Sequence, residues 1–101
     1  MGDIVLPSIV VGELLFGAAN SGRPEANLVA YKQEIDHFKV LPLDKAAAEH
    51  YAEIRLYLKQ RGRPIPENDV WIAAICRANE VPLFTLDRHF SEVPNLQLMG
   101  A

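Results

Sequence analysis

The stretch of sequence that decides the fold is Gly62-Arg63-Pro64-Ile65-Pro66-Glu67-Asn68-Asp69-Val70-Trp71-Ile72-Ala73-Ala74. Its two prolines interrupt any preceding helix, and the apolar run after them predicts a new helix over Glu67–Asn79. Acidic and amide side chains stand in the first turn of this helix. Carboxylates are common there because they complement the positive end of the helix dipole and cap free N–H groups. Asp69 is therefore explained either by such local effects or by a role in a binding site.

Helices and short apolar strands alternate along the rest of the chain. The clearest helix begins after Asp44, which is expected to cap it, and ends at Gly62. Its apolar residues recur at helical spacing and form one stripe: Ala47, Tyr51, Ile54 and Leu58. Two earlier helices are expected over Ile9–Ala19, with Ser8 as its N-cap, and over Glu25–Asp36. Short strands are expected over Asp3–Pro7, Phe38–Leu43, Val81–Leu86 and Leu96–Met99. This alternation predicts an α/β fold with a short, mainly parallel sheet.

Length and composition limit the class of protein. The chain has 101 residues, half of them hydrophobic, which fits one packed domain over residues 1–101. Its formal charge of −3 excludes a strongly basic nucleic-acid module, so any nucleic-acid contact must come from a local patch. No apolar run is long enough to span a membrane and no signal peptide opens the chain, so a cytoplasmic location is expected. The single cysteine, Cys76, lies in an apolar run and is expected to be a small buried side chain.

Two further carboxylates, Glu13 and Asp87, stand where apolar sequence gives way to a charge. Glu13 is the only charged residue of an otherwise apolar helix, so we expect it to be buried. A buried charge costs several kcal/mol unless it is paired with an arginine or binds a metal. Asp87 follows a predicted parallel strand, at the edge where open α/β sheets bind ligands, but it could equally cap the turn Arg88–Phe90. Three carboxylates far apart in sequence are what a hard divalent cation would require.

A basic run, Lys59, Arg61 and Arg63, precedes the Asp69 segment. Such a run is commonly a solvated helix end that complements the negative pole of the dipole, but beside a metal site it could bind a phosphodiester backbone. Thr85 could hydrogen-bond a site carboxylate or only satisfy a strand end.

Other kinds of chemistry find no support in the sequence. The three histidines lack a zinc-ligand spacing, and there is no serine-nucleophile, P-loop or dinucleotide-binding motif. Glu67 and Asn68 are expected to be exposed first-turn residues. Tyr51, Tyr57 and Trp71 are expected to be aromatics of the core or its edge.

Four segments resemble PIN domains of the VapC type, the toxin half of bacterial toxin–antitoxin pairs. They are Val11–Ala18, Tyr51–Arg55, Arg63–Ala74 and Leu83–Phe90. The resemblance covers the chain from Val5 onward. It implies an α/β/α sandwich with a parallel sheet, and cleavage of RNA with Mg²⁺ or Mn²⁺ held by acidic residues. Glu13, Asp69 and Asp87 match the family's metal-site carboxylates.

The resemblance also implies a mechanism and partners. Metal-assisted hydrolysis of RNA is expected, in which the cation lowers the pKa of a water and neutralises charge on the phosphate. The implied partners are an RNA substrate, a VapB-type antitoxin and a second copy of the chain, in the cytoplasm of a bacterium or archaeon. The alternative is an inactive PIN remnant that only binds an antitoxin or another subunit. A generic small-molecule domain would need a cofactor motif that the sequence lacks.

One family feature has no counterpart in the sequence. PIN domains normally open with an apolar strand ending in Asp-Thr-Asn, which supplies the first metal ligand and lies centrally in the sheet. Asp3 does not replace it, because it stands at the start of the family's second strand. We therefore expect an N-terminally truncated domain with weak metal binding and impaired activity, and exposed strand edges that favour strand exchange in a dimer. The reading frame upstream is then expected to encode Leu-Asp-Thr-Asn or a similar segment.

Overall fold

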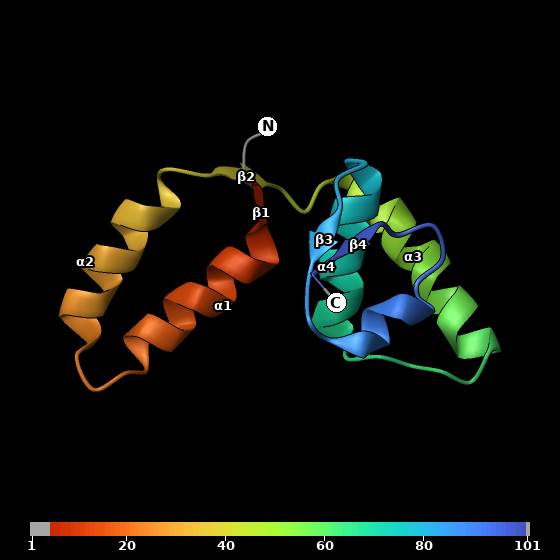
Figure 1. Ribbon diagram of the computed structural model, residues 1–101, viewed down its shortest axis with the longest axis horizontal. Coiled ribbons are helices and arrows are strands. Elements are labelled where there is room, and N and C mark those ends of the chain that lie inside the picture. The colour runs from red at the N-terminus through yellow and green to blue at the C-terminus, as the bar shows by residue number, and fades with distance from the viewer. Residues whose placement is uncertain (1–4, 101) are drawn as a thin grey trace. The chain divides into compact units, whose positions relative to one another are not determined.

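The fold is that of a computed structural model, which describes residues 5–100 (Figure 1). The contacts within the chain fall into two compact units, Met1–Leu41 and Pro42–Ala101. Within the described residues, each unit contains two α-helices and one pair of parallel strands, and the second unit also has a short 3₁₀ helix. The predicted alternation of helices with short parallel strands is therefore confirmed.

The first unit is a pair of helices joined to a two-stranded sheet. Its elements are β1 (Val5–Pro7), α1 (Ser8–Ala19), α2 (Pro24–Ile35) and β2 (Lys39–Leu41). β1 and β2 pair in parallel, with Val5 opposite Lys39 and Pro7 opposite Leu41. The part of the first predicted strand that precedes Val5 lies outside the described residues.

The helix boundaries in this unit differ slightly from those predicted. Ser8 is the first residue of α1 and not its N-cap; Pro7 holds the N-cap position and no side chain caps the helix. The turn between α1 and α2 is held by Ser21, whose Oγ donates to the carbonyl of Ala18 (2.6 Å). The same Oγ accepts a hydrogen bond from Nδ2 of Asn27 (2.9 Å), so the start of α2 is tied to the end of α1.

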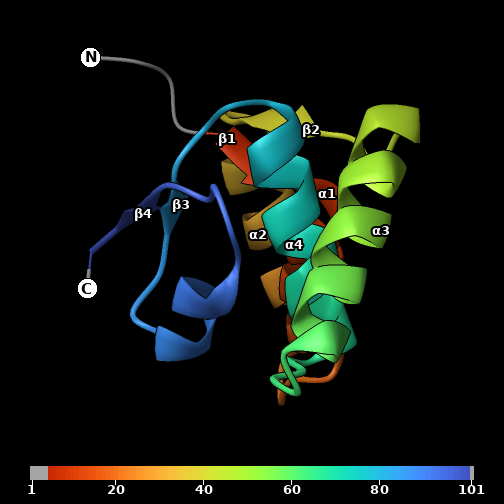
Figure 2. The ribbon, with the colours of Figure 1, turned by 90° about the vertical axis from the view of Figure 1, so that its right-hand side faces the viewer.

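The second unit contains the longer helices and the segment that decides the fold. Its elements are α3 (Lys45–Gln60), α4 (Glu67–Ala78), β3 (Leu83–Phe84), the short 3₁₀ helix η1 (Arg88–Glu92) and β4 (Leu98–Met99). β3 and β4 pair in parallel, with Leu83 opposite Leu98. Figure 2 shows α3 and α4 side by side, with β3, β4 and η1 on the other side of α4.

Both ends of α3 form as the sequence predicts. The Oδ1 atom of Asp44 accepts a hydrogen bond from the backbone N–H of Ala47 (3.0 Å), which satisfies one free donor of the first turn. At the other end Gly62 has a positive φ of 65°, a conformation that costs glycine little. This lets the N–H of Arg63 reach the carbonyl of Leu58 (3.0 Å), as in a Schellman motif.

The core of the second unit lies between α3, α4 and η1. The cluster of buried side chains consists of Ile54, Leu58, Val70, Ala73, Ala74, Phe90 and Val93. Small residues at Ala73 and Ala74 allow close packing of α4, because neither presents a bulky side chain. Three members of the apolar stripe predicted on α3, Ala47, Ile54 and Leu58, are buried, and Tyr51 packs against the cluster.

Arg77 links three parts of this unit near the end of α4. Its side chain is only 9% exposed, and its Nε donates to Nδ1 of His50 on α3 (2.7 Å). Its Nη1 donates to the carbonyl of Pro94 (3.1 Å), and its Nη2 lies 3.3 Å from Oε1 of Glu53. The guanidinium therefore connects α4 to α3 and to the loop after η1.

Cys76 is buried, at 2% exposure, as its apolar neighbours predict. Burial raises the pKa of its thiol to about 11, because the charged thiolate is poorly solvated there. Among the described residues, no helix has both the length and the apolar character needed to cross a membrane.

Replacing Ile54 by alanine is expected to lower the free energy of unfolding by about 2–5 kcal/mol, because the change leaves a cavity in a fully buried site. Urea unfolding followed by the fluorescence of the single tryptophan, Trp71, measures this in the second unit. The matched control is Leu56→Ala on the same helix, where the side chain is 55% exposed and a change of about 0.5 kcal/mol or less is expected. Equal losses in the two variants would contradict the packing described.

The thiol of Cys76 is expected to resist Ellman's reagent in the folded protein at pH 8. With a pKa of about 11, only about one thiol in a thousand is ionised at that pH, and the thiolate is the reactive form. Unfolding in guanidinium should restore an ordinary thiol pKa and give rapid reaction of one thiol per chain. Rapid labelling of the folded chain would show that Cys76 is accessible.

Candidate metal centre

Asp69 lies in the first turn of α4, where the sequence left open whether it caps the helix. The N-cap residue is Pro66, and no side chain caps α4. The Oδ2 atom of Asp69 instead lies 2.7 Å from Nε2 of His89, twenty residues further along the chain. Capping therefore does not explain this carboxylate, although its position still complements the helix dipole.

Asp87 stands between β3 and η1, and its two carboxylate oxygens have different partners. Oδ1 accepts a hydrogen bond from the backbone N–H of His89 (3.2 Å), which caps η1. Oδ2 lies 2.9 Å from Nε2 of the same histidine. Asp87 can therefore both cap η1 and contribute to a binding site, since Oδ1 caps the helix while Oδ2 faces His89.

Thr85 positions Asp87 through a hydrogen bond to its backbone. Its Oγ1 accepts a hydrogen bond from the backbone N–H of Asp87 (3.0 Å), and its own N–H donates to the carbonyl of Met99 (3.0 Å). The hydrogen bonding between β3 and β4 thus extends to Thr85, two residues before Asp87.

Three side chains converge at this point. The ligand atoms of Asp69, Asp87 and His89 all lie within 4.8 Å of one another, and these residues are the one such group found within residues 5–100. The side chain of Asp69 is 22% exposed, that of His89 35% and that of Asp87 49%, so solvent reaches all three. Two carboxylates and an imidazole are a donor set suited to a divalent cation, because each supplies a lone pair and the carboxylates supply negative charge.

The sequence predicted Asp69 and Asp87 but missed His89. The three histidines lack a zinc-ligand spacing among themselves, and His89 lies two residues after Asp87 in a 3₁₀ turn. The pattern Asp-x-His at the end of a predicted strand was the available signal. This pattern indicates a metal site only in combination with Asp69, which lies close to His89 in the folded chain.

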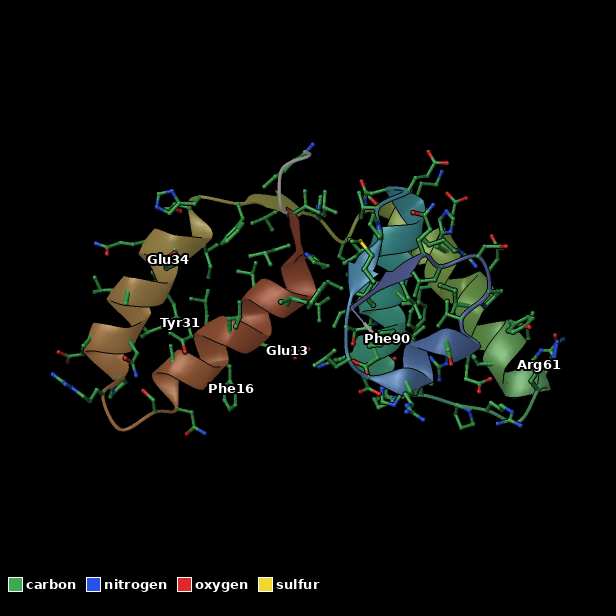
Figure 3. All side chains as sticks on the ribbon, in the orientation of Figure 1. Glu13, Phe16, Tyr31, Glu34, Arg61 and Phe90 are labelled. Atoms are coloured by element: carbon green, nitrogen blue, oxygen red, sulfur yellow. The ribbon has the colours of Figure 1, made fainter. Side chains whose placement is uncertain are left out.

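Glu13 belongs to the first unit and lies in the middle of α1 (Figure 3). The expectation that it is buried is wrong, because its side chain is exposed. The physical reason is that α1 packs on α2 and β1 within its unit, and Ala18 is its one buried residue. Glu13 forms no ion pair with a described residue, which argues against the arginine partner considered for it.

The basic run is exposed, and two of its members have weak local partners. The guanidinium of Arg61, at the end of α3 (Figure 3), lies 4.7 Å from the ring centre of Tyr57. Nη1 of Arg63 lies 3.7 Å from Oε1 of Glu92, the last residue of η1. Exposed ion pairs and exposed cation–π contacts each contribute about 1 kcal/mol or less, so both cations can exchange these partners for a phosphate. Lys59 is exposed near the end of α3.

A cavity of about 370 Å³ lies beside the first turn of α4, between α3 and the proline segment. Tyr51 forms part of its wall and stacks on Trp71, with ring centres 3.7 Å apart. The Tyr51 hydroxyl donates to Oε1 of Glu67 (2.6 Å), and this hydrogen bond is the main reason why the pKa of Tyr51 is raised. Arg55 lies 3.6 Å from the same oxygen. Glu67 is exposed, as predicted, but it also joins α4 to α3.

Comparison with known proteins shows that the PIN domain family matches residues 1–96. The chain belongs to the PIN-domain family. It is 34% identical to the tRNA(fMet)-specific endonuclease VapC of Shigella flexneri, over 95% of this chain and 74% of that protein.

Solved structures show the same relationship. The structure of VapBC2 from Rickettsia felis, bound to a DNA fragment from its promoter, matches with a TM-score of 0.90 and 30% identity. That match covers 96% of this chain and 74% of the other chain. VapBC-1 from nontypeable Haemophilus influenzae matches with a TM-score of 0.91 and 30% identity, over 96% and 73% of the two chains. The predicted PIN-like α/β fold and the resemblance to VapC proteins are confirmed.

Proposed function

We propose that this chain is a metal-dependent endoribonuclease toxin of the VapC type, which hydrolyses phosphodiester bonds in RNA. The observation that supports this most directly is the convergence of Asp69 and Asp87 in a PIN-domain protein. Relatives that match over most of the chain are named as ribonucleases, which supports the same reaction.

Asp69 and Asp87 are the proposed metal-binding carboxylates, and the cation is Mg²⁺ or Mn²⁺. Their oxygens lie close enough to bind one ion together, and Thr85 and the cap of η1 hold Asp87 in place. A divalent cation, when bound, supplies positive charge for the phosphate and lowers the pKa of water. The assignment of Glu13 to the same site rests on the family resemblance and remains a prediction.

Lys59, Arg61 and Arg63 are the proposed contacts for the RNA backbone. The Arg63–Glu92 ion pair brings one of these cations to η1, the element that also carries His89. Phosphate contacts of this kind position a nucleic acid without reading its sequence. Thr85 is a further candidate contact for RNA, but the hydrogen bond from the Asp87 N–H to its Oγ1 favours a role in positioning Asp87.

The proposed protein partner is a VapB-type antitoxin. Solved structures that resemble this chain are VapBC complexes, which supports such a partner. A homodimer, a single domain over residues 1–101 and a cytoplasmic location remain predictions from the sequence.

The chain is expected to cleave single-stranded RNA when Mg²⁺ or Mn²⁺ is present and to stop when the metal is chelated. Asp69→Asn and Asp87→Asn should each lower the cleavage rate by on the order of 100-fold, because each removes a metal-binding charge. Gel analysis of a labelled RNA, with each variant's fold checked by circular dichroism, measures the effect.

Glu49→Gln is the matched control for these variants. It removes one carboxylate charge from an exposed position on α3 and should leave cleavage unchanged. Equal activity in Asp69→Asn and the unmodified chain would refute the proposed site. A chain that binds a VapB-type antitoxin but cleaves no RNA with either metal would instead favour the inactive binding module.

A further inference from the structure

We propose that Nε2 of His89 is a direct ligand of the cation, so that the site holds one imidazole and two carboxylates and selects Mn²⁺ over Mg²⁺. This inference rests on the proposed function, because it concerns the ion at that same site. It goes further in assigning a role to a histidine and in choosing between the two ions.

The Nε2 atom of His89 is spaced from the two carboxylate oxygens as a ligand of the same ion would be. Nε2 of His89 lies 2.7 Å from Oδ2 of Asp69 and 2.9 Å from Oδ2 of Asp87. Neighbouring ligands of a six-coordinate ion with bonds of about 2.1 Å lie about 3 Å apart. The nitrogen is therefore already at a distance from each oxygen that suits ligands of one ion.

Hydrogen bonding accounts for only part of this geometry. A ring nitrogen carries at most one N–H, which points along one line in the ring plane. It can form a linear hydrogen bond with one of the two oxygens but not with both. A linear hydrogen bond therefore accounts for one of the two contacts, whereas a cation shared by the three ligand atoms would account for both.

The fold holds the imidazole of His89 in position. The backbone N–H of His89 is fixed by Oδ1 of Asp87, and the next residue, Phe90, is 5% exposed in the core of the unit. The His89 ring also packs near the Phe90 ring, with centres 5.5 Å apart. Ligands held in this way lose little conformational entropy when they bind an ion.

The chemistry of the donor set then determines which ion is favoured. Mg²⁺ prefers oxygen ligands and gives up its water reluctantly. Imidazole nitrogen suits transition ions better, while carboxylates suit both Mg²⁺ and Mn²⁺. A site with one nitrogen and two oxygens should therefore bind Mn²⁺ more tightly than Mg²⁺.

The test is pulsed electron paramagnetic resonance of Mn²⁺ bound to the chain, produced without a polyhistidine tag. The unmodified chain should show nitrogen modulation from one imidazole, and His89→Gln should lose it. His37→Gln, at an exposed position after α2, is the matched control and should retain the signal. Calorimetry should show Mn²⁺ affinity reduced about tenfold or more in His89→Gln, with Mg²⁺ affinity changed less than about threefold.

A second variant tests the selectivity directly and does not depend on loss of binding. His89→Asp replaces the nitrogen by an oxygen ligand, so the ratio of Mn²⁺ to Mg²⁺ affinity should fall by on the order of tenfold. Circular dichroism of each variant shows whether it has folded. Because the His89 side chain is 35% exposed, both replacements should be accommodated.

The outcomes separate this inference from the proposed function. Mn²⁺ that binds without nitrogen modulation, or that binds His89→Gln as tightly as the unmodified chain, would overturn the role of His89. Loss of Mn²⁺ binding in Asp69→Asn alone would then still support the carboxylate site. A chain that binds neither Mn²⁺ nor Mg²⁺ would overturn both this inference and the metal-dependent function.

Discussion

Val70 and Phe90 are buried in the same apolar cluster, and their shared burial determines where the candidate site lies. Val70 directly follows Asp69, and Phe90 directly follows His89. Burying a Val or Phe side chain contributes about 1.5–3 kcal/mol, far more than an exposed pair of charged groups. Apolar packing therefore brings the polar side chains together, and their own attraction has only to set the final distances.

Much of the second unit follows from its sequence because the signals there are local. Asp44 and Gly62 fix the ends of α3 through hydrogen bonds within a few residues, and the apolar stripe between them specifies the buried face. Asp69 and Asp87 were recognisable because Asp69 directly precedes an apolar run and Asp87 directly follows one. His89 was not, because its contact with Asp69 spans twenty residues and depends on how η1 packs against α4.

Glu13 was predicted to be buried, but its side chain is exposed. An apolar helix predicts burial on every side, but the packing within the first unit covers only part of α1. The apolar sequence of a helix indicates how much apolar surface it carries, whereas its tertiary contacts determine how much of that surface is buried. The N-cap of α1 differs from the prediction for a local reason: Pro7 has the extended backbone conformation of an N-cap, so Ser8 becomes the first residue of the helix.

The arrangement of charges explains how two carboxylates can remain so close. Two unit charges about 4 Å apart repel by about 4 kcal/mol near a protein surface, which opposes the packing that unites α4 and η1. Nε2 of His89 contacts both carboxylates, and the cap of η1 adds an N–H donor to Asp87, so each oppositely polarised group offsets part of this repulsion. The single N–H of a ring nitrogen can donate a linear hydrogen bond to only one oxygen, so part of the repulsion is left for a bound cation to offset. When Nε2 carries no proton, its lone pair is available to a cation that the two carboxylates attract.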